Sequence, residues 1–223
     1  IISKDGYIVT NNHVVSGATS LKVTTTDGTE YDASVVGKDS QTDLAVIKVD
    51  ANNLQAATLG DSDILQVGDP AIAIGNPLGE LGGTVTTGII SATDRQITID
   101  DETMTLLQTD AAINPGNSGG GLFNADGNLI GIVNAKESST GIEGLGFAIP
   151  ITPAQDIITE LMQNGSVTSR PALNVSLYDY TSNNQSQYSK YEDGCYIVQI
   201  LKNGAADKAG LKQNDRILSF AGE

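Results

Sequence analysis

The sequence predicts a mainly β protein built as a barrel or a sandwich. Three observations support this prediction: the apolar runs are short, turn-forming residues separate them regularly, and only one segment shows a clear helical pattern. A parallel α/β sheet would need a helix between successive strands. At 223 residues the chain is long enough for one large core or two smaller domains.

The expected strands are apolar segments bounded by Gly, Asp, Asn or Pro. Leu21, Val23 and Thr25 alternate with polar residues and lead into a hairpin turn at Asp27-Gly28. A second hairpin turn is expected at Asp126-Gly127. Further short apolar runs predict strands at 44–49, 71–74, 85–92, 104–109 and 129–133.

The clearest helix is expected after Pro150. Thr152 could cap its first turn, Pro153 suits the start of a helix, and Gln155 would complete a capping box. Gly165 would end the helix. The apolar face, expected to pack on the second half of the preceding β domain, consists of Ile157, Ile158, Leu161 and Met162. Residues 165–171 then read as a linker, and 172–223 as a second unit.

One serine, Ser118, stands among glycines in Asn114–Gly121. Small neighbours allow a sharp turn and a close approach of substrate. The amides of Gly116 and Ser118, with the Asn117 peptide between them, could converge on one point and hold a developing negative charge. A plain glycine-rich turn is the competing interpretation.

The only histidine, His13, follows an apolar strand and could act as the base that a serine nucleophile needs. A third group must orient the imidazole. Asp43 is favoured, because it opens the apolar run 44–49, where an unpaired carboxylate would be costly. A strand-start cap is its alternative role, and Asp110 and Asp39 are competing candidates.

Composition excludes several classes of protein. The formal net charge is −15, carried mainly by residues 1–150, and no basic patch is visible, so nucleic acid is not expected as a partner. No apolar run is long enough for a membrane span. The lone Cys195 lies in an expected buried strand and cannot form an internal disulfide. No zinc-type ligand spacing and no nucleotide-binding motif occurs, so neither metal nor cofactor is expected.

Six segments together resemble the HtrA/DegP family of serine proteases. The order of His13, Asp43 and Ser118 is the chymotrypsin-like order. The resemblance spans nearly the whole chain and rests on Thr10–Val15, Thr42–Val49, Gly75–Gly79, Thr84–Ser91, Gln108–Gly120 and Gly144–Pro150.

The resemblance implies a chymotrypsin-like double β-barrel over residues 1–151, in which the N-terminal strand is expected to be missing. A connecting helix and linker would follow over 152–171. Residues 172–223 would form a truncated PDZ domain. Asn174 stands where the carboxylate-binding loop of the family usually has Gly, which places C-terminal peptide capture in question; Asn tolerates left-handed backbone better than other non-glycine residues.

The resemblance also implies an ATP-independent endopeptidase that cleaves unfolded or misfolded proteins in extracytoplasmic quality control and stress response. His13, Asp43 and Ser118 would be its triad, and the full-length protein would form a homotrimer. A proteolytically silent relative, acting as a chaperone or a peptide-binding scaffold, is the alternative.

Substrate contacts are predicted at two places. Counting back from Ser118, Ala112 and Ile113 would form an apolar pocket floor that favours Val, Ala or Ile at the cleavage position, unless Asp110 lines it and favours Lys or Arg. The segment Leu145, Gly146, Phe147 and Ala148 could pair with the substrate backbone as an added strand.

Overall fold

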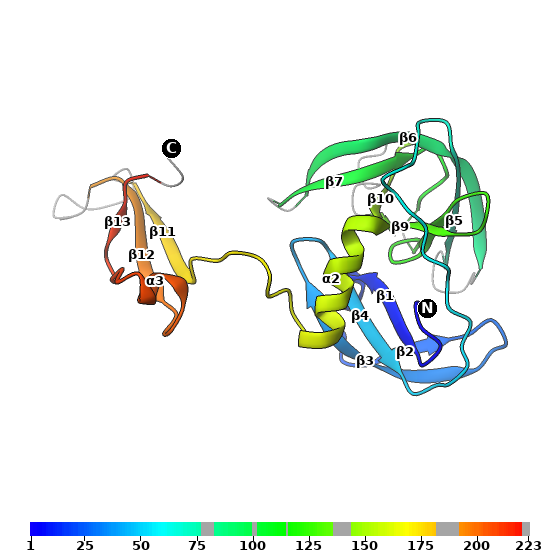
Figure 1. The fold of residues 1–223 in the computed structure, drawn as a ribbon, viewed down its shortest axis with the longest axis horizontal. Coiled ribbons are helices and arrows are strands. Elements are labelled where there is room, and N and C mark those ends of the chain that lie inside the picture. Colours follow the sequence, from blue (N-terminus) through cyan, green and yellow to red (C-terminus); the bar gives the residue numbers. More distant parts are fainter. Residues whose placement is uncertain (77–82, 100–101, 115, 136–143, 182–191, 220–223) are drawn as a thin grey trace. The chain divides into compact units, whose positions relative to one another are not determined.

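The computed structural model describes all residues except 77–82, 100–101, 115, 136–143, 182–191 and 220–223 (Figure 1). The chain divides into two compact units, Ile1–Thr168 and Ser169–Glu223. Both are dominated by antiparallel strands, so the mainly β prediction is confirmed. Each unit is described by itself below.

The first unit opens with a four-stranded antiparallel sheet in the order β1-β4-β3-β2. Within the described residues this sheet is not closed into a barrel, although a double barrel was predicted. A single helical turn, α1 (Asn12–Val15), follows the first strand directly. The strands are β1 (Tyr7–Asn11), β2 (Leu21–Thr24), β3 (Glu30–Asp39) and β4 (Leu44–Val49).

The position of strand β4 between two buried clusters explains why its sequence does not alternate between apolar and polar residues. Leu44 and Val46 belong to the main core, together with residues of β9, β10 and the long helix α2. Ala45 and Ile47, on the opposite face, pack with Val15 in a separate cluster. Because both faces are buried, the strand is apolar at every position except the partly buried Lys48.

The second half of this unit is a closed barrel with the strand order β10-β7-β6-β5-β8-β9. Its interior is filled by small and branched side chains such as Ala73, Ile90, Leu122 and Val133. The strands are β5 (Pro70–Gly75), β6 (Thr84–Ile99), β7 (Glu102–Thr109), β8 (Gly121–Phe123), β9 (Leu129–Asn134) and β10 (Gly146–Pro150).

The predicted helix exists as α2 (Ile151–Asn164), and its expected apolar face contacts the core through Ile158 and Leu161. It packs on β3 and β4 as well as on β9 and β10, so it bridges both halves of the unit rather than only the second (Figure 1). As predicted, Gly165 ends the helix; it is left-handed at φ +73°, and its amide donates to the Leu161 carbonyl.

The predicted cap of α2 is wrong. The N-cap residue is Pro150, two residues before the predicted Thr152, and Thr152 lies within the first turn. The Thr152 amide donates to the Ser62 hydroxyl at 3.0 Å, and the Ser62 amide donates to the Thr152 hydroxyl at 2.8 Å. The capping group is therefore supplied by a loop 90 residues away, which local sequence patterns cannot reveal.

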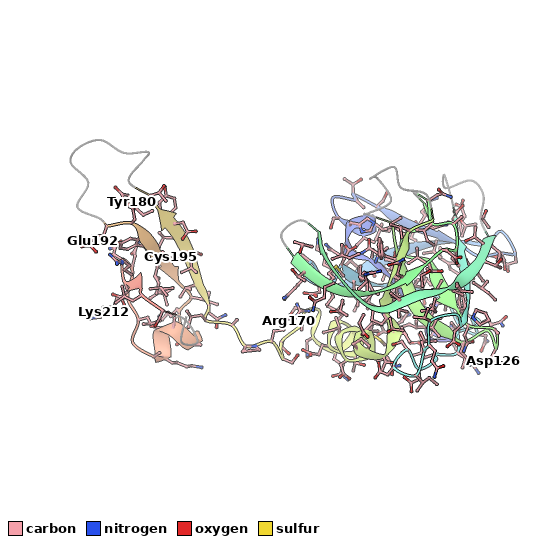
Figure 2. All side chains as sticks on the ribbon, turned by 90° about the horizontal axis from the view of Figure 1, so that it is seen from above. Asp126, Arg170, Tyr180, Glu192, Cys195 and Lys212 are labelled. Carbon is pink, nitrogen blue, oxygen red and sulfur yellow. The ribbon has the colours of Figure 1, made fainter. Side chains whose placement is uncertain are left out.

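The second unit is a three-stranded sheet in the order β11-β12-β13, formed by β11 (Val175–Tyr180), β12 (Gly194–Ile200) and β13 (Arg216–Ile217), with the short helix α3 (Ala205–Lys208). Tyr180, labelled in Figure 2, meets Tyr196 edge-to-face with ring centroids 6.3 Å apart. Asn174 is left-handed at φ +60°, as its tolerance for that conformation allows.

Cys195 is partly buried on β12, opposite Asp179 of β11 (Figure 2). Desolvation, followed by a hydrogen bond to Asp179 and the charge of that carboxylate, raises the pKa of the thiol. The thiol is therefore held protonated, which agrees with a packing role rather than a nucleophilic one.

Replacing Ser62 by Ala should lower the free energy of unfolding by about 1 kcal/mol, because the first turn of α2 loses its side-chain acceptor. Urea unfolding followed by circular dichroism measures the change. Ser20, an exposed serine outside any strand, provides the matched control Ser20→Ala, which should remain within about 0.5 kcal/mol of the parent. Equal destabilisation by both substitutions would contradict the capping role.

Candidate active site

His13 and Asp43 are brought together by the pairing of two strands. In the β1–β4 ladder Asn11 lies opposite Leu44, so the residues just beyond β1 meet those just before β4. His13 Nδ1 lies 2.6 Å from Asp43 Oδ2, and the His13 amide donates to Asp43 Oδ1 at 3.0 Å. The carboxylate thus holds both the ring and the backbone of the histidine.

Asp43 is only 3% exposed and adopts a left-handed backbone at φ +53°. Its carbonyl accepts the Asn12 amide at 2.9 Å and the Asn11 side-chain amide at 3.1 Å. A third asparagine, Asn134 at the end of β9, donates to Asp43 Oδ2 at 3.1 Å. The donors to the carboxylate, His13 and Asn134, compensate a burial that would otherwise be costly, while Asn11 and Asn12 hold the backbone carbonyl.

The competing acids are engaged elsewhere. Asp110 Oδ1 accepts the Ile89 amide at 2.7 Å, and Asp39 Oδ2 accepts the amide and hydroxyl of Thr42. The observed partner of the imidazole is Asp43, the candidate that the sequence favoured.

The loop that carries Ser118 is tied to β9 and rests against the end of β1. The Gly119 amide donates to the Val133 carbonyl at 3.0 Å, and the Val133 amide donates to the Gly120 carbonyl at 2.9 Å. A Cβ on Gly119, at φ +81°, would collide with the Thr10 hydroxyl, so only glycine allows this approach. The serine is therefore held next to the strand end that leads into His13.

The Ser118 hydroxyl accepts the Ala135 amide at 3.0 Å. Within the described part of the chain, no hydrogen bond joins this hydroxyl to the imidazole. A hydrogen bond to His13 would require the hydroxyl of this partly buried serine to turn away from the Ala135 amide.

The predicted oxyanion donors divide into two kinds. The Asn117 amide already donates to the Asn114 carbonyl at 3.0 Å, so it is not available to a ligand. Among the hydrogen bonds of the described residues, none uses the amides of Gly116 or Ser118. Asn117 is instead buried under the loop, where its side-chain amide donates to the Ala112 carbonyl at 3.3 Å.

The two predicted pocket residues, Ala112 and Ile113, lie in different environments. Ile113 is 8% exposed and packs against Gly146 within the barrel core, whereas Ala112 is exposed, with its carbonyl accepting the Thr86 hydroxyl at 2.9 Å. The observed arrangement therefore places Ile113 in the apolar wall and leaves Ala112 at the surface.

The prediction of an added substrate strand at Leu145–Ala148 is wrong for most of that segment. Gly146, Phe147 and Ala148 belong to β10, which pairs with β7 on one side and, from Phe147 onward, with β9 on the other. A strand with both edges paired cannot accept another. Leu145 precedes the strand and is exposed.

Comparison with known proteins agrees with this geometry. Residues 1–132 match the family model for a trypsin-like peptidase domain. A solved structure titled "HtrA-type protease AlgW with decapeptide" is 45% identical, with a TM-score of 0.74 over 98% of this chain and 67% of that one. The chain belongs to the HtrA-type serine proteases. The trypsin-like fold predicted from the sequence is thereby confirmed.

Two curated HtrA-type relatives extend the comparison. The serine protease Do-like HtrB of Bacillus subtilis (strain 168) is 45% identical over 99% of this chain and 51% of its own length. A probable periplasmic serine endoprotease DegP-like of Chlamydia muridarum is 48% identical over 100% of this chain and 45% of its own. The chain spans about half the length of the curated relatives that it matches.

Among the residues that the structure describes, no helix of this HtrA-type chain is both long and apolar enough to cross a membrane. No group of three or more His, Cys, Asp or Glu side chains there is arranged to hold a metal ion. Residues 77–79 of the Gly75–Gly79 motif, and Pro115 beside Gly116, lie outside the described residues.

Sequence reasoning missed the three residues that connect the site. Asn134 contacts Asp43, Ala135 contacts Ser118, and Asn11 supports the Asp43 backbone. Asn134 ends an otherwise apolar strand, and a polar residue at that position is the one sequence signal of a buried hydrogen-bonding role. Its partner, 91 positions away, could not be read from the chain.

Replacing Asn134 by Ala should reduce kcat by about tenfold or more, because one charge-assisted hydrogen bond to the carboxylate is lost. Steady-state hydrolysis of a peptide substrate measures kcat and KM separately, and KM should change little. Asn134→Ser, which retains a donor, should recover part of the loss.

The matched control is Asn128→Ala, which removes an amide from the residue before the opposite end of β9. It should leave kcat unchanged. An unaltered kcat in Asn134→Ala would show that Asp43 is held adequately without this contact.

Proposed function

We propose that this chain is the protease portion of an HtrA-type endopeptidase that hydrolyses peptide bonds of unfolded or misfolded proteins without ATP. The observation that carries the proposal is the 2.6 Å contact between His13 Nδ1 and buried Asp43, with Ser118 anchored to the adjacent end of β9. The names of its relatives as serine proteases support the same activity.

In the proposed reaction, neutral His13 takes the proton of the Ser118 hydroxyl through Nε2 as the oxygen attacks the substrate carbonyl. Asp43, which accepts the Nδ1 proton, fixes the tautomer and stabilises the imidazolium. The imidazolium then protonates the leaving amine, and an acyl-enzyme forms. Water, deprotonated by the same histidine, releases the acid and restores Ser118.

The amides of Gly116 and Ser118 are the proposed donors to the tetrahedral oxyanion, because both are free of other hydrogen bonds among the described residues. Loss of one such donor typically costs about 3 kcal/mol of transition-state stabilisation. Asn117 supports the loop from beneath rather than binding the oxyanion, since its amide is already used.

The proposed preference is for Val, Ala or Ile at the cleavage position. Ile113 packs with Val133 and Ala135 in one apolar cluster beside the nucleophile loop. The competing floor residue, Asp110, has an oxygen engaged by the Ile89 amide, which favours the apolar interpretation.

Partners and location are proposed from the relatives. Structures of AlgW are titled with bound peptides, which supports peptide and unfolded-protein substrates, and relatives described as periplasmic support an extracytoplasmic site of action in quality control and stress response. A homotrimer and capture of C-terminal peptides by a PDZ-type second unit complete the proposal. The silent-relative alternative is not supported, because the matched relatives are named proteases.

The Ser118→Ala form of the full-length protein should lose casein hydrolysis entirely while its circular dichroism spectrum stays unchanged, because the attacking oxygen is removed. A fluorophosphonate probe should label the parent protein at Ser118 and leave the variant unlabelled. Ser20→Ala serves as the control and should keep full activity. Hydrolysis by protease-free Ser118→Ala at the parent rate would refute the proposed nucleophile.

Profiling a peptide library tests the proposed preference. Cleavage should concentrate after small aliphatic residues, because a cationic side chain would lose its hydration in an apolar pocket. A strong preference for Lys or Arg would instead assign the pocket floor to Asp110.

A further inference from the structure

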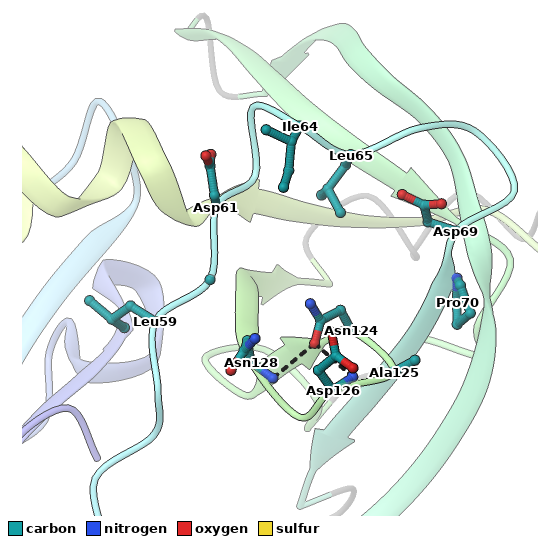
Figure 3. A pocket seen from close by; sticks show the side chains of 11 residues that line it. Leu59, Asp61, Ile64, Leu65, Asp69, Pro70, Asn124, Ala125, Asp126 and Asn128 are labelled. Atoms are coloured by element: carbon teal, nitrogen blue, oxygen red, sulfur yellow. Dashed lines mark hydrogen bonds between the residues drawn. The ribbon is translucent and has the colours of Figure 1, made fainter.

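A second concave site lies at the end of the barrel away from Ser118. A pocket of about 590 Å³ opens between the loop over residues 59–70 and the β8–β9 turn over 124–128 (Figure 3). Strand β5 runs from Pro70, at this pocket, to Gly75, whose Cβ position is filled by Asn117 beneath the nucleophile loop. Five residue steps along a strand span about 17 Å, so an occupant of the pocket would not cover Ser118.

Both walls of the pocket are preformed. The Gly60 amide donates to the Leu129 carbonyl at 2.8 Å, and the Ile90 amide donates to the Asp69 carbonyl at 2.8 Å, which anchors the loop at two points. The opposite turn is closed by Asn124 Oδ1, which accepts the amides of Asp126 and Asn128 (Figure 3). A ligand would therefore meet a site that needs little ordering on binding.

The pocket combines an accessible apolar surface with negative charge. Ile64 is 73% exposed and Leu59 41% exposed, and both contribute aliphatic surface to the lining. The carboxylates of Asp61, Asp69 and Asp126 line the same pocket. The sequence has no Lys, Arg or His between Lys48 and Arg95, and none between Arg95 and Lys136, so no basic residue of either wall neutralises them.

This combination matches one kind of side chain. A long cationic side chain can lay its aliphatic stem on apolar surface while its charged end remains among acceptors and water. The planar guanidinium of arginine is suited to carboxylates, which it can contact through two donors at once. Asp61 Oδ1 accepts the Asp63 amide and the Thr152 hydroxyl, and Asp69 Oδ2 accepts the Gln66 amide. The Asp126 carboxylate accepts no hydrogen bond from the residues that the structure describes.

We propose that this pocket is a docking site for an arginine side chain, flanked by aliphatic residues, on a segment of a partner protein. The arginine stem and its flanking aliphatic residues together lie on Leu59, Ile64 and Pro70, and the guanidinium faces Asp69 and Asp126. The partner binds at a site distinct from the peptide bond that Ser118 would cleave, so docking and cleavage do not compete for the same surface.

The test uses the ¹⁵N-labelled Ser118→Ala protein, so that the probe is not hydrolysed. The probe is the acetylated and amidated pentapeptide Gly-Leu-Arg-Leu-Gly, compared with the same peptide carrying citrulline, a neutral isostere, in place of arginine. Titration should shift the backbone amide resonances of 59–70 and 124–128, and the citrulline peptide should bind more weakly by about twofold to fivefold.

Two substitutions and their matched controls locate the contact. Asp126→Asn and Ile64→Ser should each weaken binding of the arginine peptide by about twofold to fivefold. Asp63→Asn and Val67→Ser make the corresponding changes, acid to amide and branched aliphatic residue to serine, at exposed positions of the loop over 59–70 that do not line the pocket. Both should leave the dissociation constant unchanged.

The proposal is overturned if arginine and citrulline peptides bind equally, if Asp63→Asn weakens binding as much as Asp126→Asn, or if resonance shifts occur only elsewhere in the chain. Self-association that Ile64→Ser abolishes, detected by sedimentation without peptide, would instead assign the pocket to a second copy of the chain. Saturable shifts with Ca²⁺ but not with the peptide would assign it to a cation.

Discussion

The hydrogen bonding of the buried Asp43 carboxylate is the interaction on which the rest of the site depends. It is almost fully removed from water, and a carboxylate in that position is tolerated only when donors surround it. The donors to the carboxylate come from two separate parts of the chain: the amide and ring of His13 after β1, and the side chain of Asn134 at the end of β9. Satisfying one buried charge therefore joins the four-stranded sheet to the closed barrel at the point where the chemistry would occur.

The end of β9 connects this carboxylate to the serine. Asn134 contacts Asp43, and its neighbour Ala135 contacts the Ser118 hydroxyl, so consecutive residues reach both ends of the proposed triad. The Ser118 loop is in turn bound to β9 through Gly119 and Gly120. A displacement of β9 would therefore disturb the acid and the nucleophile together. Every residue of this strand is buried, so its position is fixed by core packing.

Helix α2 and strand β5 extend this framework to the far side of the molecule's first unit. The helix bridges both halves of that unit, and its first turn is held by Ser62 from the same loop that forms one wall of the acidic pocket. Strand β5 has the pocket at one end and the support of the nucleophile loop at the other. One loop thus serves the stability of the helix and the shape of a surface that a partner protein can use.

The sequence by itself predicted the fold class and a helix that follows Pro150 and ends at Gly165, and it favoured Asp43 over Asp110 and Asp39 as the partner of His13. These features depend on local patterns: apolar periodicity, turn residues, and an acid placed at the mouth of a buried strand. The resemblance to HtrA-type proteases joined them into one site, because it supplied the spatial relation of distant motifs.

Only the tertiary structure decided the contacts made between distant segments. The cap of α2 by Ser62, the support of Asp43 by Asn134 and the double pairing of β10 all join residues far apart in the chain. Single polar side chains such as Thr152 and Asn134 can satisfy a hydrogen bond with many partners, so their types alone do not specify which one. The partner is determined by how whole strands and helices pack, and that packing forms only when the hydrophobic core assembles.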